Sequence, residues 1–147
     1  MARFRMTTIV YKDGVLAGDR LITFQDQVFG ESSKVFLIKD YAVGLAGSLA
    51  VFPDFLKFVA GEDFNKAVFD KEVSFDAVVI HRETKEITTY AKNLIAEKIE
   101  KIEFIALGSG ASIAKGALLM GATPSEAIKI AAKIDLFTND NIDEIIL

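Results

Sequence analysis

The sequence predicts a single domain of the α+β class, in which antiparallel strand pairs and helices occupy separate stretches of the chain. Three observations predict this class. Short apolar runs that suit strands are joined by tight turns, as at Asp13-Gly14. Apolar residues then recur at helical spacing over residues 48–60. The segment 123–126, Thr-Pro-Ser-Glu, has the pattern of a capped helix start.

Most of the expected strands form antiparallel hairpins: 7–11 with 15–18, 35–38 with 41–46, and 75–80 with 87–90. From their order along the chain, we expect the first two hairpins to lie in one sheet. Another hairpin is expected within 20–33, with its turn near Gly30. Residues 103–107 predict a further strand, and 143–147 predict a closing strand.

Three helices are expected on the outer faces of the sheets. The helix at 48–60 ends at Gly61, and a second helix, at 111–121, ends at a glycine. The third begins at Thr123, with proline at its first position and a glutamate that completes a capping box. The charged run 97–103 alternates in the way that is typical of an exposed edge strand.

The composition fits one globular domain with a sizeable core. The chain has 147 residues, of which 51% are hydrophobic and 26% charged. It contains no cysteine, which excludes disulfides and thiol nucleophiles. The net charge of −4, without a basic stripe, argues against a nucleic-acid partner. There is no membrane-length apolar run and no secretory signal pattern, so we expect a cytoplasmic protein with no membrane partner.

A candidate nucleophile opens the first strand. Thr7 and Thr8 follow the segment MARFRM. A threonine hydroxyl attacks carbonyl groups well when a base lies beside it, and a free N-terminal amine, with a pKa of about 7.7–8.0, is such a base. We therefore interpret residues 1–6 as a short removable leader and residues 7–147 as the functional domain. The ordinary alternative is that both threonines are β-branched strand residues.

Four further residues have the chemistry that such a nucleophile needs. Asp19 ends the second strand and Lys34 precedes a later one, so a carboxylate could hold a cation beside the nucleophile. Gly47 could offer a backbone N–H to an oxyanion, and Ser109 a second hydroxyl. Each also has a structural interpretation: surface charges for Asp19 and Lys34, a turn for Gly47 and a helix cap for Ser109.

The motifs TTIV, DG, AGD, KV, GLAGS, IALGSG and LFTN occur in an order that resembles the proteasome β-type family, in particular the HslV-type ATP-dependent peptidase of bacteria. The resemblance covers residues 7–60 and 102–147. It implies the four-layer αββα fold of N-terminal nucleophile hydrolases. It also implies that Thr7 is the nucleophile of a threonine peptidase, that Asp19 and Lys34 are its charged pair, that Gly47 is the oxyanion amide and that Ser109 lies near the amine.

The same resemblance implies a substrate pocket, an ion and partners. Leu45 would line the pocket for the residue before the cut, which favours apolar residues there. Backbone carbonyls of Ala132, Asp135 and Thr138 would bind a monovalent cation such as Na⁺, although the chemistry itself needs no cofactor. The implied partners are further copies of the chain in a homo-oligomeric ring, an ATP-dependent unfoldase, and protein or peptide substrates.

The sequence departs from the family pattern in two places. The stretch between residues 60 and 75 is too short for the second long helix of the family, so the helical layer after residue 60 is shortened. The family's acidic residue near the end of the last helix aligns with Lys133. His81, the only histidine, is interpreted as exposed and isolated. Two other functions stay open: a catalytically silent assembly module that retains its leader, and an amide hydrolase for small molecules.

Overall fold

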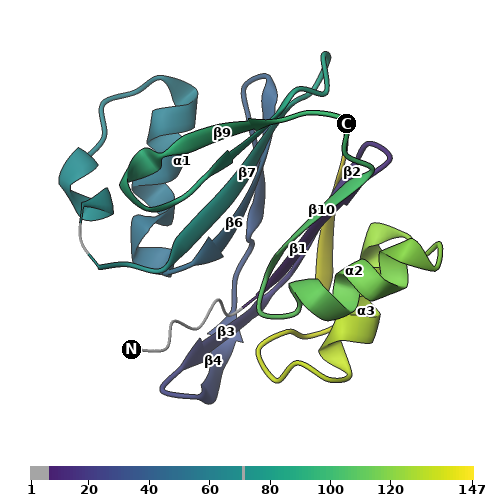
Figure 1. Ribbon diagram of the computed structural model, residues 1–147. Helices are drawn as coiled ribbons and strands as arrows, with labels where there is room; N and C mark the ends of the chain where they lie inside the picture. The colour runs from purple at the N-terminus through teal and green to yellow at the C-terminus, as the bar shows by residue number, and fades with distance from the viewer. Residues whose placement is uncertain (1–6, 71) are drawn as a thin grey trace.

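Two antiparallel β-sheets stack face to face in the computed structural model, with helices on both outer faces (Figure 1). The structure describes residues 7–70 and 72–147, so the expected leader lies outside the described residues. The layers run α-β-β-α, as predicted. Among the described residues, no helix is long and apolar enough to cross a membrane.

The four-stranded sheet has the order β10 (Phe104–Gly108), β1 (Thr8–Lys12), β2 (Val15–Asp19) and β11 (Ile142–Ile146). The five-stranded sheet has the order β5 (Val35–Ile38), β6 (Tyr41–Gly47), β7 (Phe75–His81), β8 (Ile87–Tyr90) and β9 (Ala96–Ile99). All neighbouring strands are antiparallel. Strand β9 is an edge strand that contains only the first part of the expected charged edge, residues 97–99.

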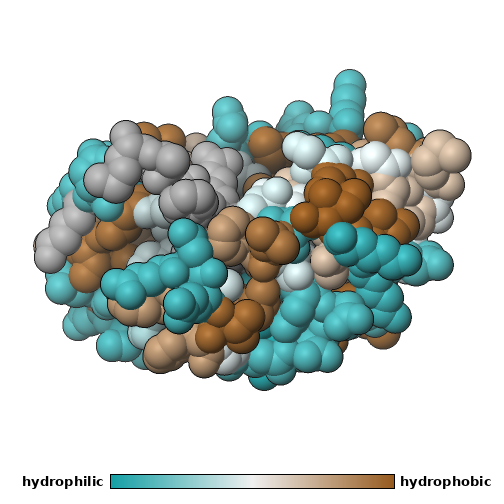
Figure 2. Space-filling model, turned by 90° about the horizontal axis from the view of Figure 1, so that it is seen from below, coloured by the Kyte–Doolittle hydropathy of each residue, from teal (hydrophilic) through white to brown (hydrophobic). Residues whose placement is uncertain are grey.

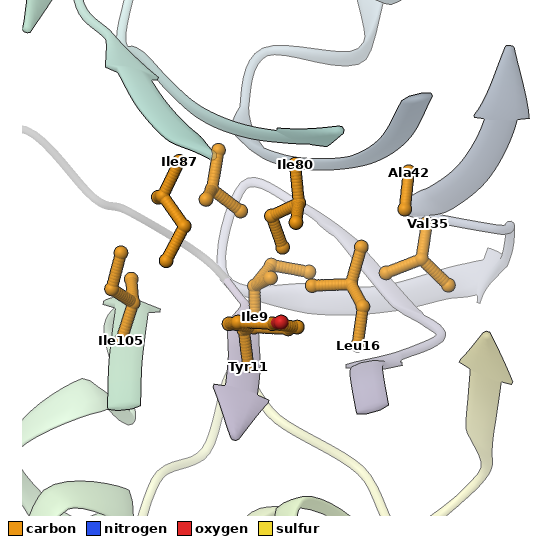
Figure 3. Packing of buried hydrophobic residues seen from close by; sticks show 9 residues of the cluster. Ile9, Tyr11, Leu16, Val35, Ala42, Ile80, Ile87 and Ile105 are labelled. Carbon is orange, nitrogen blue, oxygen red and sulfur yellow. The ribbon is translucent and has the colours of Figure 1, made fainter. Parts of the chain in front are cut away.

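The expectation that the first hairpin and the hairpin at 35–46 share a sheet is wrong. Strands β1 and β2 belong to one sheet, and β5 and β6 to the other. Their apolar faces meet across the core, where Ile9 and Leu16 pack with Val35 and Ala42 (Figure 3). Both hairpins are apolar on this face, and stacking them face to face removes these side chains from water.

Helix α1 (Phe52–Ala60) covers the five-stranded sheet, after a short 3₁₀ turn, η1 (Leu49–Val51). It ends at Gly61 in the left-handed conformation, as predicted. Phe55 is fully buried at the centre of this layer and lies against Phe69 and Phe75. Among the described residues between α1 and β7, the short helix η2 (Lys66–Phe69) is the only helix, which explains the shortened helical layer.

Helices α2 (Ala111–Leu119) and α3 (Pro124–Ala132) cover the other sheet. Small residues such as Ala114 and Ala131 pack close to this sheet. The predicted capping box is present: Thr123 accepts from the Glu126 N–H, and the Glu126 carboxylate accepts from the Thr123 N–H. The α3 N-terminus is therefore fixed as the sequence predicted.

Strands β3 (Leu21–Phe24) and β4 (Gln27–Glu31) form a separate hairpin. The expected turn near Gly30 is wrong, because Gly30 lies within β4. The turn is at Gln25 and Asp26, which have φ values of 50° and 62°. Two consecutive residues with positive φ are typical of a tight hairpin turn, which needs no glycine where an aspartate tolerates the conformation.

His81 is half-buried at the end of β7 rather than exposed. Its Nδ1 accepts hydrogen bonds from the backbone N–H groups of Glu83 and Thr84, both at 3.2 Å. The residue therefore organises the turn into β8. A further short helix, η3 (Lys92–Leu94), connects β8 to β9.

Candidate active site

The buried polar and charged residues of the described chain gather at one end of the four-stranded sheet. They are Thr7, Thr8, Asp19, Lys34 and Thr138. The start of β1 and the end of β2 meet there because the two strands are antiparallel. Burying such groups is costly unless they are hydrogen-bonded, and no buried side-chain N or O atom in the described residues lacks a partner. The cluster is thus a satisfied polar network inside an apolar fold.

Asp19 is the centre of this network. Its Oδ1 accepts from the Thr7 hydroxyl, the Thr8 N–H at 3.0 Å and the Lys34 ammonium at 2.9 Å. Its Oδ2 accepts from the N–H groups of Leu21 at 3.1 Å and Asn139 at 3.2 Å. The carboxylate is fully buried, so these donors take the place of water. The expected contact between Lys34 and Asp19 is present, and Thr7 shares the same carboxylate oxygen.

Lys34 is 2% exposed, and its ammonium also donates to the Leu21 carbonyl at 2.7 Å. Burial lowers the pKa of Lys34 from its ordinary value, while the charge and hydrogen bond of Asp19 oppose the shift. The side chain is therefore a positioned cation with a reduced hold on its proton. Surface charges, the ordinary interpretation of Asp19 and Lys34, are excluded by this burial.

On the other side of Thr7 lies a second carboxylate. The Thr7 nitrogen donates to Ser109 Oγ at 3.2 Å, and Ser109 Oγ donates to Asp135 Oδ2 at 2.6 Å. The sequence comparison aligned the family's acidic residue with Lys133. The carboxylate that contacts Ser109 belongs to Asp135, two residues later. Lys133 caps α3, whereas Asp135 lies in the following turn, where its N–H donates to the Ala131 carbonyl at 2.8 Å.

A pocket of about 380 Å³ opens beside Thr7 and Lys34. Leu45, the predicted pocket residue, and Gly47, the predicted oxyanion amide, are both among its lining residues. Gly47 has a φ of +112°, and a Cβ there would overlap the Ser74 carbonyl, so the site requires glycine. Further apolar walls come from the β3–β4 hairpin, from η1 and from the start of α1: Leu21, Phe24, Phe29, Leu49, Ala50 and Phe52.

Figure 2 views the molecule from below, the side at which Figure 1 shows the β3–β4 hairpin. Hydrophobic residues form several patches across the middle of this face, between polar ones. Phe24 and Phe29 on the hairpin are 62% and 75% exposed. Apolar side chains are thus both in the pocket wall and on the surface of the hairpin.

The expected cation site lies at the end of α3. The Asp135 carbonyl accepts from the Thr138 N–H at 3.3 Å. Ala132 and Thr138 line one cavity, of about 430 Å³, together with Lys129 and Lys133. The positive charges of the two lysines repel a metal cation and so count against Na⁺ binding in this cavity. The Na⁺ site stays a prediction.

The stacked sheets and outer helices are the fold of an HslV subunit and of other solved structures. Three such structures have TM-scores between 0.66 and 0.71. Thiobacillus denitrificans BPH in complex with epoxomicin has a TM-score of 0.71, with 19% identity over 96% of this chain and 97% of that chain. Thiobacillus denitrificans BPH has a TM-score of 0.70, with 17% identity over 96% of both chains.

The third, eukaryotic HslV from Trypanosoma brucei, has a TM-score of 0.66, with 24% identity over 96% of this chain and 98% of that chain. Comparison of the sequence with protein-family models and with curated proteins finds no match. The identities are low, so the structural likeness establishes the fold alone.

Proposed function

We propose that this chain is a threonine peptidase subunit in which Thr7, once it is the first residue, attacks peptide bonds. One observation carries the proposal: the buried Asp19 carboxylate accepts from both the Thr7 hydroxyl and the buried Lys34 ammonium. Structural threonines at the start of a strand do not need a buried carboxylate and a buried lysine. Such a costly arrangement is typical of a functional site.

In the proposed reaction, the Thr7 hydroxyl gives its proton to the free Thr7 amine and its oxygen attacks the carbonyl carbon of the substrate. Lys34 stabilises the negative charge that develops, and the Gly47 N–H binds the oxyanion. The C–N bond then breaks, and the protonated amine returns its proton to the leaving amine. Water, with the amine as base, hydrolyses the ester formed on Thr7.

The nitrogen of Thr7 acts as a base only as an amine. In the full sequence this nitrogen forms the amide bond to Met6, and an amide has no basic lone pair. Cleavage after Met6 is therefore part of the proposal. It is supported by the position of the Thr7 hydroxyl, which is on the residue that follows the bond to be cut.

The pocket predicts which peptides the site accepts. Because its walls are mostly apolar, peptides with leucine or phenylalanine before the cut bond should be cleaved faster than peptides with aspartate or lysine there. We expect kcat/KM to differ by at least roughly tenfold, the scale on which hydrophobic pockets discriminate. The measurement is a panel of fluorogenic peptides that differ only at this position, with a chain that begins at Thr7.

Ala50→Glu tests the pocket itself. Ala50 is an exposed residue of the pocket wall, so a carboxylate there should reverse part of the preference in favour of lysine. Ala96→Glu, on the exposed edge strand β9, is the matched control and should leave the panel unchanged. An unaltered panel in Ala50→Glu would show that substrates bind elsewhere. Epoxomicin, which is bound in one of the similar structures, offers a second ligand for the same pocket.

We also propose that the subunit works in a homo-oligomeric ring fed by an ATP-dependent unfoldase. The support is the likeness to HslV, and size-exclusion chromatography with light scattering measures the assembly directly. The catalytically silent assembly module is the second candidate function. It is favoured by the amide bond between Met6 and Thr7 in the full sequence, which leaves Thr7 without a free amine. The short η2 segment leaves the layer around α1 thinner than the other helical layer, which counts against a ring built through that layer.

A further inference from the structure

We propose that Thr8 is a positioning residue: through Thr138, its hydroxyl holds the Asp135 carboxylate against Ser109, and so orients Ser109 toward the Thr7 nitrogen. This inference rests on the proposed function of Thr7. It gives the second of the two adjacent threonines a role of its own, separate from that of a strand residue.

The contacts fix the direction of each hydrogen bond. Thr138 Oγ1 lies 2.6 Å from Asp135 Oδ2, and an ionised carboxylate only accepts, so Thr138 donates. Its single proton is then in use. Thr8 Oγ1, 2.7 Å from Thr138 Oγ1, must therefore be the donor of that bond. Protons thus point from Thr8 to Thr138 to Asp135.

Asp135 Oδ2 accepts a second hydrogen bond, from the Ser109 hydroxyl. Ser109 Oγ lies 2.6 Å from Asp135 Oδ2 and 3.3 Å from the Thr7 carbonyl, and its one proton goes to the nearer, charged acceptor. The other face of Ser109 Oγ accepts from the Thr7 nitrogen at 3.2 Å. The network therefore presents a lone pair, rather than a proton, to the Thr7 nitrogen.

The Thr8 hydroxyl is buried and closely packed. Thr8 is fully buried and Thr138 is 4% exposed. Gly110 lies against them so closely that a Cβ there would overlap the Thr8 hydroxyl and come within 3.1 Å of Thr138 Oγ1. The backbone of the Gly-Ser-Gly segment thus packs directly on the Thr8–Thr138 pair. Ser109 is held between Gly110 and the end of β10.

The consequence falls on the free Thr7 amine. A lone pair from Ser109 and the nearby Asp135 charge both favour the protonated amine, so both raise its basicity. Without the Thr8 hydroxyl, Thr138 loses the donor that fixes its orientation, and the Asp135 carboxylate that it holds can turn away from Ser109. The Ser109 proton is then free to bond to the amine lone pair, which makes the amine a weaker base. Asp19 and Lys34, on the other side of Thr7, keep their contacts in either case.

The test uses two pairs of variants of the chain that begins at Thr7, each pair differing only in the hydroxyl. The first pair is the unsubstituted chain against Thr8→Val, which keeps the shape and suits a strand. The second pair is Thr8→Ser against Thr8→Ala, which remains informative if valine prevents folding. Thr88→Val, on strand β8, is the control for an ordinary threonine substitution.

We expect Thr8→Val to lower kcat roughly tenfold, part of the 10²–10⁴-fold that a positioned base contributes. KM should be unchanged, because Thr8 does not line the pocket. The acid limb of the pH–rate profile should move to lower pH, and Thr8→Ser should retain most of the activity that Thr8→Ala loses. Unchanged kcat and an unshifted limb in Thr8→Val would overturn the inference, as would equal losses in Thr8→Ser and Thr8→Ala.

A readout without turnover separates this inference from the proposed function. The pH dependence of acetylation of the Thr7 α-amine by acetic anhydride, followed by peptide mass spectrometry, reports the pKa of the amine directly. The pKa should be lower in Thr8→Val than in the unsubstituted chain. If no peptide is cleaved but this difference is seen, the proposed peptidase fails while the positioning by Thr8 stands. An identical pKa in both chains would refute the positioning.

Discussion

A chain that begins at Thr7 should cleave peptides with apolar residues before the cut bond, whereas the full-length chain that retains residues 1–6 should be silent. The reason is that the base exists only when the Thr7 nitrogen is an amine. Thr7→Ala in the shortened chain removes the attacking oxygen and should lower kcat by roughly 10⁴-fold or more, as loss of a nucleophile does in other hydrolases. Hydrolysis of fluorogenic peptides by the assembled proteins measures all three.

The control for this comparison is Thr88→Ala in the shortened chain, which removes a hydroxyl far from Thr7 along the chain and should retain activity. Cleavage by the Thr7→Ala chain at the unsubstituted rate would exclude Thr7 as the nucleophile. Silence of the shortened chain, assembled and supplied with an unfoldase, would favour the structural module over the peptidase.

Asp19→Asn should reduce the free energy of unfolding by about 3–5 kcal/mol, the usual cost of breaking a buried ion pair. The substitution removes the charge that balances Lys34, and it presents an N–H₂ group to donors that need an acceptor. The loss is comparable to the total stability of many small domains. Urea unfolding of the full-length chain, followed by circular dichroism, measures it without any need for activity.

Asp13→Asn is the matched control for that substitution. Asp13 is exposed in the turn between β1 and β2, with a φ of 52° that asparagine also tolerates, so its stability should change by less than about 0.5 kcal/mol. If Asp19→Asn were as mild as Asp13→Asn, the buried network around Thr7 would not contribute to stability as the contacts imply.

The elements that were predicted correctly from the sequence are those specified by residues close together in the chain. The turn at Asp13-Gly14 and the capping box at Thr123 depend on residues within a few positions of each other, and both are present. The turn at Gln25 and Asp26 was missed because it contains no glycine.

The assignment of the first two hairpins to one sheet was wrong, because the sheet that a hairpin joins depends on strands far away in the sequence. Strand β1 pairs with β10 as well as with β2, and β6 pairs with β7 across the whole α1 segment. A hairpin pattern does not say which of two sheets receives the hairpin. The face-to-face packing of Ile9 with Val35 and Ala42 decides it.

In the site, Thr7, Asp19, Lys34 and Gly47 were predicted together. The structure places Thr7, Lys34 and Gly47 at one pocket, with Asp19 buried against Thr7 and Lys34. Asp135 was predicted only as a backbone ligand. Its carboxylate was missed because the alignment placed the acidic position on α3 rather than in the turn that follows. The aspartate in the segment IDLFTN, after a capped helix end, was the available signal.

The most direct test of Thr7 as nucleophile is to find the acyl group on it. A chain that begins at Thr7 is mixed with an activated peptide ester, quenched in acid within the first turnover, digested and mapped by mass spectrometry. The ester-linked acyl group should be on the N-terminal peptide, at the Thr7 side chain, and should be missing from Thr7→Ala. Turnover with the acyl group on another residue, or with the same adduct in Thr7→Ala, would contradict the assignment of Thr7.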